Sequence, residues 1–380
     1  MKLFFPNLLQ KAFKFLCVTM ITPLLLTSCG KGKSMQAIPV EEVEDTFFLD
    51  EIADSRSYVL LDDGSLDAIV GDITQVMVDD GLIFVSHVPN AKGNDIDQII
   101  SVYDKEGRFL NKIGQKGRAR NEFLRIRSWC IDKDSKEVLM YDLDAYAIKK
   151  YTYDGTFITQ TSIPKEIDLM KLFLTDKRMY VQSTVPNDVS DDFMELREDG
   201  SYTPLLPMRQ MATDGGWRVG IVSHFRDQDL KDFYHLRAFD NTLYRISDGK
   251  ADSCGYFEFI DVPPANKLEN LTFDYLITLK QPNECYETPA YFVASEFEAA
   301  DYVYHKPTGK CTCYRYDIAK LPYRRKIVGV AGDVLIAGVS ASDAQIALKE
   351  HPELIPEQDK VMLETVAGRE NDALVFYHLK

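Results

Sequence analysis

A short turn returns along the chain at nearly regular intervals, and it constrains the fold more than any other feature of the sequence. Each copy places a glycine after an acidic residue and an aromatic residue two positions after the glycine, with strand-like runs on both sides. This arrangement is typical of a β-hairpin, because glycine adopts the positive φ that a tight turn needs. The clear copies contain Gly107, Gly155 and Gly200, which are 48 and 45 residues apart, and weaker copies follow at Gly249 and Gly309.

A repeat of this length with about four strands in each unit is the signature of a β-propeller. The first unit predicts strands at 75–78, 82–85, 99–103 and 109–113, and the second at 128–132, 138–141, 147–151 and 157–162. Later units follow the same plan, although the fourth is less regular.

The last unit is one strand short, whereas the N-terminus has one strand to spare. This unit contains a helical segment at 342–350, which begins at a serine cap and ends before Pro352, and a final strand at 373–377. The extra strand at 58–61 could pair with the final strand and remove two open sheet edges. The sequence therefore predicts an all-β, six-bladed β-propeller over residues 47–380, with its last blade closed by an N-terminal strand and carrying a short helical insertion.

Residues 1–28 have the composition of an export signal. Three lysines accompany an apolar core at 15–26 that is too short to span a bilayer comfortably. The core ends in Leu26-Thr27-Ser28-Cys29, which resembles the lipobox of bacterial lipoproteins. That resemblance implies that residues 1–28 are removed and that Cys29 is acylated, for example with palmitate, while residues 29–46 form a flexible tether. The alternative is a plain signal peptide or a short anchor.

The charge of the chain restricts its partners. The formal net charge is −15, and loss of the three signal lysines would move it to about −18. Such an acidic surface argues against binding to nucleic acid or to anionic lipid headgroups, which need basic patches. Membrane attachment would come from the acyl chains on Cys29. We expect a monomer whose partner is a glycan, a peptide or an envelope protein.

Cysteine usage does not indicate a disulfide framework. Five cysteines remain after Cys17 and Cys29 are set aside, and an odd number leaves at least one unpaired. Cys311 and Cys313 alternate on a predicted strand and so lie on one face. We interpret them as small buried residues, with a disulfide to Cys254 or Cys285 as the alternative.

The chain resembles the six-bladed β-propeller lipoproteins of Gram-negative envelopes, of the type found in gut anaerobes, which are relatives of NHL-repeat propellers. The residues that carry this resemblance are Gly71-Asp72-Ile73, the run from Phe109 to Gly117, Glu122-Phe123 and the C-terminal segment 371–380. The resemblance covers roughly residues 47–380. It implies a fold and, because Gly30 rather than an aspartate follows Cys29, an address at the outer membrane. The membrane face, periplasmic or external, stays open, and the resemblance implies no reaction.

Candidate site residues can be named, although no nucleophile signature is present. His87 follows a second strand, whose end often lies at a channel mouth. Arg118, Arg120, Arg125 and Arg127, with Trp129 beyond them, form the basic run of an acidic protein and could bind an anionic sugar or phosphate. Asp142 and Asp144 could be acid–base carboxylates or ligands of Ca²⁺. For each, a structural role is the alternative: a core histidine, a solvated inter-blade loop or a turn-forming acid.

Two functions from different classes follow. The first is an envelope-anchored module whose propeller binds or scaffolds a glycan, a peptide or a protein partner. The second is a propeller hydrolase or lyase acting on a carbohydrate or a lactone, with Ca²⁺ or a His/Asp set in the channel. An enzyme needs several titratable groups that converge on one substrate position. We favour the binding module, because a fold by itself implies no chemistry, and we predict no catalytic residue and no obligatory cofactor.

Overall fold

The fold is taken from a computed structural model of the chain. It describes residues 35–44, 46–89, 98–167, 169–183, 191–207, 222–237, 239–264, 275, 278–296, 300–315, 323 and 325–380. The expected signal peptide, 1–28, and the expected lipidation site, Cys29, lie outside these residues. Residues 36–380 form one compact unit. In the described part of the chain, no helix is long and apolar enough to cross a membrane.

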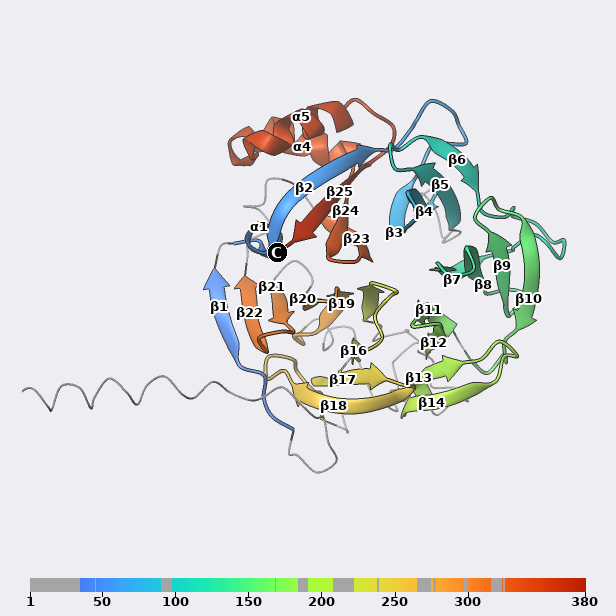
Figure 1. Cartoon of the computed structure of the whole chain (residues 1–380). Coiled ribbons are helices and arrows are strands. Elements are labelled where there is room, and N and C mark those ends of the chain that lie inside the picture. The colour runs from blue at the N-terminus through green and yellow to red at the C-terminus, as the bar shows by residue number, and fades with distance from the viewer. Residues whose placement is uncertain are drawn as a thin grey trace, which may run out of the picture. The chain divides into compact units, whose positions relative to one another are not determined.

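The described strands form sheets that follow one another round a ring (Figure 1). The first three sheets have four antiparallel strands each, and neighbours in sequence are neighbours in the sheet. Their strands are β3 (Asp72–Asp79), β4 (Leu82–Val88), β5 (Ile99–Asp104) and β6 (Phe109–Lys112); β7 (Ile126–Asp132), β8 (Glu137–Asp142), β9 (Ala147–Thr152) and β10 (Phe157–Ser162); and β11 (Leu169–Thr175), β12 (Arg178–Ser183), β13 (Asp191–Leu196) and β14 (Tyr202–Pro207). The strands predicted for the first two units are confirmed.

The fourth unit departs from this plan. Only β16 (Phe233–Leu236), β17 (Thr242–Ser247) and β18 (Lys250–Tyr256) form its sheet among the described residues. The strand that precedes them, β15 (Ser223–Arg226), pairs instead in parallel with β19 (Pro282–Glu287) of the next sheet. Five sheets of the described chain therefore have four or more strands, and we count five blades. The prediction of six blades is wrong, because the innermost strand of the fourth unit has moved to its neighbour.

The sheet that receives β15 is the largest, with six strands. It contains β19, β20 (Tyr291–Glu296), β21 (Ala300–His305) and β22 (Lys310–Arg315), and β1 (Val40–Glu44) pairs in parallel with the outer strand β22. The acidic end of the segment expected to be a flexible tether therefore belongs to a sheet. Within the described residues, Cys130, Cys285, Cys311 and Cys313 are free thiols. Cys311 and Cys313 are buried on β22, as we interpreted them.

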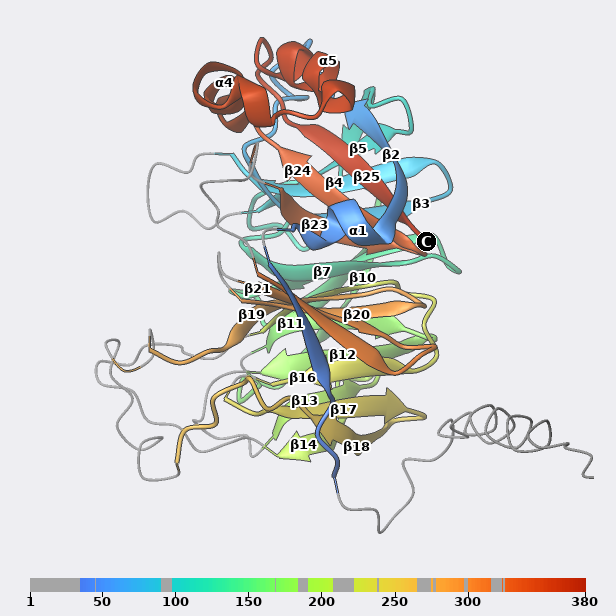
Figure 2. The ribbon, with the colours of Figure 1, turned by 90° about the vertical axis from the view of Figure 1, so that its left-hand side faces the viewer.

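The last sheet joins the two ends of the chain. β23 (Lys326–Ala331), β24 (Val334–Val339) and β25 (Ala373–Leu379) form three of its strands, and β2 (Ala53–Leu60) pairs antiparallel with β25. The predicted pairing of the N-terminal strand with the C-terminal strand is thus present. The short helix α1 (Phe48–Ile52) leads into β2. The predicted helical insertion consists of α4 (Ala341–Glu350), η2 (Pro352–Leu354) and α5 (Glu357–Val366), which lie beside the last sheet (Figures 1 and 2).

The repeated turn glycines have a packing role that explains their recurrence. Gly107, Gly155 and Gly200 have φ between +83° and +87°. A Cβ on Gly155 would lie 2.6 Å from the carbonyl oxygen of Lys112, at the end of the outer strand of the preceding sheet. Gly107 and Gly200 approach the outer strands β2 and β10 in the same way. The turn of each outer hairpin therefore packs against the outer strand of the preceding sheet, and only glycine leaves room for that contact.

We expect Gly155→Ala to lower the free energy of unfolding by roughly 3 kcal/mol, since the left-handed backbone and the blocked carbonyl contact both oppose a side chain. Gly81→Ala is the matched control: Gly81 also has a positive φ of 75°, but nothing lies within 4 Å of its Cβ position. It should cost about 1 kcal/mol, the backbone term alone. Urea denaturation of both variants measures the difference, and equal losses would contradict the packing role.

Candidate functional site

Asp142 and Asp144 hold a loop in place. The buried carboxylate of Asp142 accepts hydrogen bonds from the backbone N–H groups of Leu124 (3.0 Å) and Arg125 (3.1 Å), and Lys149 lies 3.5 Å away. Asp144 accepts a hydrogen bond from the side chain of Arg125. Both acids therefore fix the segment that enters β7, and neither lines the central channel described below.

The basic run does not form one patch. Arg118 and Arg120 are exposed, whereas Arg125 pairs with Asp144. Arg127 is half-buried, and its guanidinium donates to the sulfur of Met170 on β11, 2.8 Å away. Trp129 is fully buried in the core between the first two sheets. The residues therefore divide between a solvated loop and the contact between two sheets.

His87 is a core histidine, 1% exposed. Its Nδ1 accepts a hydrogen bond from the backbone N–H of Gly71 (3.1 Å), so the proton lies on Nε2, which donates to the hydroxyl of Ser101 (3.1 Å). Burial, with a smaller contribution from Lys112, lowers the pKa of His87 to about 4. The side chain is neutral, and both ring nitrogens have hydrogen-bond partners in or beside the first sheet, so neither is available to a ligand.

Calcium has no evident ligand set. Among the described residues, no group of three or more His, Cys, Asp or Glu side chains is placed to hold a metal ion. Ca²⁺ binding therefore stays a prediction.

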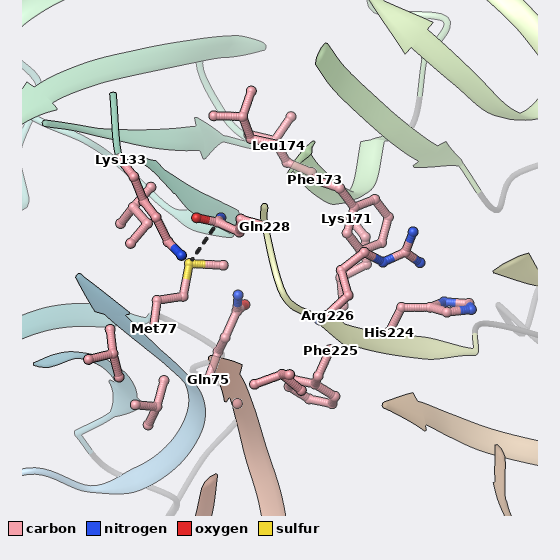
Figure 3. A pocket seen from close by; sticks show the side chains of 16 residues that line it. Gln75, Met77, Lys133, Lys171, Phe173, Leu174, His224, Phe225, Arg226 and Gln228 are labelled. Atoms are coloured by element: carbon pink, nitrogen blue, oxygen red, sulfur yellow. Dashed lines mark hydrogen bonds between the residues drawn. The ribbon is translucent and has the colours of Figure 1, made fainter. Parts of the chain in front are cut away.

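A pocket lies where the inner strands of five sheets converge (Figure 3). Its wall comes from β3, β7, β11, β15 and β23, together with the segments that follow β7 and β15. The volume is about 30 Å³, and the residues are Gln75, Val76, Met77, Val78, Ile131, Lys133, Lys171, Leu172, Phe173, Leu174, His224, Phe225, Arg226, Gln228, Gly329 and Val330. The strands approach closely here, since a Cβ on Gly329 would lie 2.3 Å from the carbonyl oxygen of Val76. We call this space the channel pocket.

Two cations line the channel pocket without an ionic partner in the described chain. The guanidinium of Arg226 is 7% exposed, and none of its three nitrogens donates a hydrogen bond to a described residue. Its carbon lies 4.7 Å from the ring centre of Phe173 and 4.2 Å from that of Phe233. The ammonium of Lys171 lies 5.8 Å from the ring centre of Phe225. Burial lowers the pKa of both groups, that of Arg226 to about 10.

The histidine beside these cations is neutral. Nδ1 of His224 donates to the carbonyl of Val222 (3.0 Å), and its ring stacks on His235 with centres 4.7 Å apart. Burial holds the pKa of His224 well below its usual range, and the charges of Arg226 and Lys171 lower it further. His224 and Arg226 line the channel pocket from β15, and Lys171 lines it from β11.

The segment that follows β15 crosses one mouth of the channel. Asp227 donates its N–H to the carbonyl of Glu287 (3.0 Å) and accepts from the N–H of Gly332 (3.2 Å). The carbonyl of Gln228 accepts from Asp176, and its amide donates to the sulfur of Met77 (3.6 Å). These bonds reach four sheets, so the displaced strand β15 is fixed at its end as well as along its length.

A second pocket of about 160 Å³ adjoins this segment. It shares Ile131, Lys133, Leu174 and Gln228 with the channel pocket, so the two spaces are neighbours. Its charged residues form two ion pairs, Lys133 with Asp229 (2.8 Å) and Lys177 with Asp134 (2.8 Å), beside two further acids, Asp132 and Asp176. We call it the mouth pocket.

Sequence reasoning missed Lys171, Arg226 and the channel pocket. Neither residue belongs to a motif, and the strand 223–226 was not predicted because it is short and follows an irregular stretch. The one available signal was Lys171 within the apolar run Leu169–Leu174, because the segment 222–226 reads Val-Ser-His-Phe-Arg and is not apolar. Single buried cations of this kind look like surface residues in a sequence.

The ring of sheets around the channel pocket defines a β-propeller, and a model of one protein family matches nearly all of the described chain. Residues 35–378 match a family described as a domain of unknown function, DUF4934. The chain belongs to that family. The match identifies neither NHL repeats nor a lipoprotein family. No curated protein matches the chain.

Solved structures share the fold. An exported protein from Bacteroides fragilis aligns with a TM-score of 0.68 at 15% identity, over 90% of this chain and 100% of that one. A member of the DUF4221 family from Bacteroides vulgatus aligns at 0.49 and 11% identity, over 87% and 97%. Virginiamycin B lyase from Staphylococcus aureus aligns at 0.44 and 13% identity, over 74% and 81%. At such identities the first likeness shows the fold alone, and the two weaker ones carry no argument about function.

The neutral state of His87 predicts a pH-dependent loss of stability. Between pH 6.5 and 4 the unfolded chain takes up a proton on this histidine and the folded chain does not, so the free energy of unfolding falls as the pH falls. The loss from this residue should be about 3 kcal/mol and should level off below pH 4.

Urea unfolding of the wild type and of His87→Gln at several pH values measures the effect as a difference, which removes the contribution of other groups. The variant should lose about 3 kcal/mol less than the wild type across this window. His378→Gln, at an exposed position, is the control. Parallel pH profiles for the wild type and His87→Gln would contradict the assigned protonation state.

Proposed function

We propose that this protein is a lipoprotein anchored to the outer membrane through acylated Cys29, and that its propeller is a binding module for a glycan, a peptide or a protein partner. The channel pocket and the mouth pocket receive part of that ligand. The protein stays at the envelope as a receptor or scaffold, on the periplasmic or the external face.

The convergence of five sheets on one pocket of mixed apolar and polar lining carries this proposal. Binding sites in proteins are concave and largely apolar, with a few polar groups that set orientation. The channel pocket has this composition: apolar side chains from every strand surround a small number of polar groups, among them Gln75, Lys171 and Arg226. Buried charges without partners are costly to a folded protein, and a ligand that pairs with them would offset that cost.

The proposed location draws on two observations. The leader sequence has the features of an export signal that ends in a lipobox. The similar protein from Bacteroides fragilis is an exported protein. An acidic chain would not be drawn to anionic headgroups, so the acyl chains would supply the attachment.

The alternative of a hydrolase or lyase has no observation in its favour in the described part of the chain. His87, Asp142 and Asp144, which could have formed a catalytic set, have structural hydrogen-bond partners and lie outside the channel pocket. The channel pocket itself contains cations and a neutral histidine, without a carboxylate among its lining residues.

A variant that fills the opening between the two pockets tests the proposal. Gln228 lines both pockets from a loop, so Gln228→Trp should block the passage with little effect on the sheets. Lys231→Trp, on the same loop but exposed, is the matched control. The melting temperatures of the three proteins are measured with a panel of acidic and neutral oligosaccharides and muropeptides.

A ligand that binds only the folded state stabilises it and therefore raises the melting temperature. At a ligand concentration 100 times the Kd, the stabilisation is about 2.7 kcal/mol. We expect one ligand class to raise it for the wild type and for Lys231→Trp, and to leave Gln228→Trp unchanged. The proposal fails if Gln228→Trp responds like the wild type, or if no member of the panel changes the wild type.

A further inference from the structure

We infer that the channel pocket binds a carboxylate group, which accepts hydrogen bonds from the guanidinium of Arg226 while the ammonium of Lys171 supplies the second positive charge. This inference rests on the proposed function and adds to it the chemical class of the ligand: a sugar acid or a peptide with a free carboxylate.

In the described chain, the three guanidinium nitrogens of Arg226 have no hydrogen-bond acceptor. The rings of Phe173 and Phe233 each lie within 5 Å of the guanidinium carbon. Contacts with aromatic rings stabilise the charge, but they accept no conventional hydrogen bond from the N–H groups. Buried donors of folded proteins nearly always have acceptors, so a guanidinium with three unpaired nitrogens indicates a missing acceptor.

The nearby acids do not supply that acceptor. Both carboxylate oxygens of Glu287 accept hydrogen bonds from the N–H of Tyr234, at 2.8 and 3.0 Å, and one also pairs with Lys306 at 2.8 Å. Glu284, the acid that acts most on Lys171, accepts a hydrogen bond from the hydroxyl of Tyr286. Neither acid forms an ion pair with Arg226 or Lys171 in the described part of the chain, although each attracts one of the two cations through space.

The size of the channel pocket favours a small anionic group. A water-sized atom needs on the order of 10–15 Å³ of such space, so the 30 Å³ of the pocket corresponds to about two oxygens. A carboxylate has two oxygens in one plane, which match two parallel N–H groups of a guanidinium. Sulfate and phosphate are larger groups, with four oxygens in a tetrahedron. Apolar side chains in the wall strengthen the attraction between opposite charges.

The mouth pocket would take the rest of the ligand. It adjoins the channel pocket and is several times larger, at about 160 Å³. Its polar side chains are two ion pairs, the acids Asp132 and Asp176 and the amide of Gln228, which suit hydroxyl or amide groups of a ligand rather than a second negative charge. Both a uronic acid and the C-terminal residue of a peptide have this form, a carboxylate beside polar neutral groups.

Small probes test the inference directly. The melting temperature of the purified protein is measured at constant ionic strength with sodium acetate, acetamide or sodium sulfate. Acetamide has the shape of acetate without its charge, and sulfate is a tetrahedral anion with two charges. Because sulfate stabilises folded proteins in general, each response is taken relative to that of an unrelated control protein in the same salt. On this scale acetate alone should raise the melting temperature. Glucuronate and N-acetylalanine, which present the same group on a sugar and on an amino acid, then distinguish the two sources by the larger shift.

Two variants place the site. Arg226→Met should weaken acetate binding by on the order of 10- to 100-fold, the usual effect of removing a charge-assisted pair of hydrogen bonds. Lys171→Met should weaken it about tenfold. Arg120→Met removes an exposed arginine far from the channel in sequence and should change nothing. Without a ligand, Arg226→Met should melt no lower than the wild type, because the variant loses an unpaired buried charge.

The outcomes separate this inference from the proposed function. Equal responses to acetate and acetamide or sulfate, or an unchanged acetate response in both Arg226→Met and Lys171→Met, would overturn the carboxylate site. If an oligosaccharide or muropeptide still stabilises the wild type and fails with Gln228→Trp, the channel remains the binding site and only the assigned chemistry is wrong. If Arg226→Met does not fold, Lys171→Met alone decides.

Discussion

The parallel pairing of β15 with β19 is the interaction on which the centre of this propeller depends. In a regular blade the innermost strand pairs with the second strand of its own sheet. Here the hydrogen bonds of residues 223–226 go to the neighbouring sheet instead, and the segment 227–229 is fixed by bonds to four sheets. A strand held in this way cannot follow the symmetry of the ring, although its side chains line the channel pocket together with those of β3, β7, β11 and β23.

This displacement brings a charged side chain into a buried position, where an unpaired charge destabilises the folded state. Arg226 lies on β15 and enters a pocket whose other walls are mostly apolar, so its desolvation is not repaid by an ion pair within the pocket. Natural proteins depart from good packing mainly at sites of function, where the cost is offset elsewhere. The repeated contacts between the outer hairpins and the preceding sheets, together with the pairing of β2 with β25, supply a rigid frame that can tolerate such a site.

The regular parts of the fold follow from short-range patterns, and the irregular part does not. The strands of the first two sheets were predictable within a few residues, because alternating apolar residues and turn glycines act locally. The number of blades was not predictable, because it depends on which strand the four-residue strand β15 pairs with. A strand of that length has almost no periodicity of its own, and its register with β19 is decided by residues about sixty positions further along the chain.

Among the candidate residues, the sequence by itself determined chemical type but not placement. It identified an all-β repeat, a net negative charge, and Cys311 and Cys313 as small buried residues. The export signal with a lipobox at Cys29 stays a prediction. Only the tertiary structure showed that His87 and Asp142 form hydrogen bonds with backbone groups of the fold. It also showed that Lys171 and Arg226, which the sequence did not single out, line one pocket. The reason is physical: a side chain's role depends on which other groups satisfy its charge and hydrogen bonds, and in a propeller those groups come from sheets that are distant in sequence.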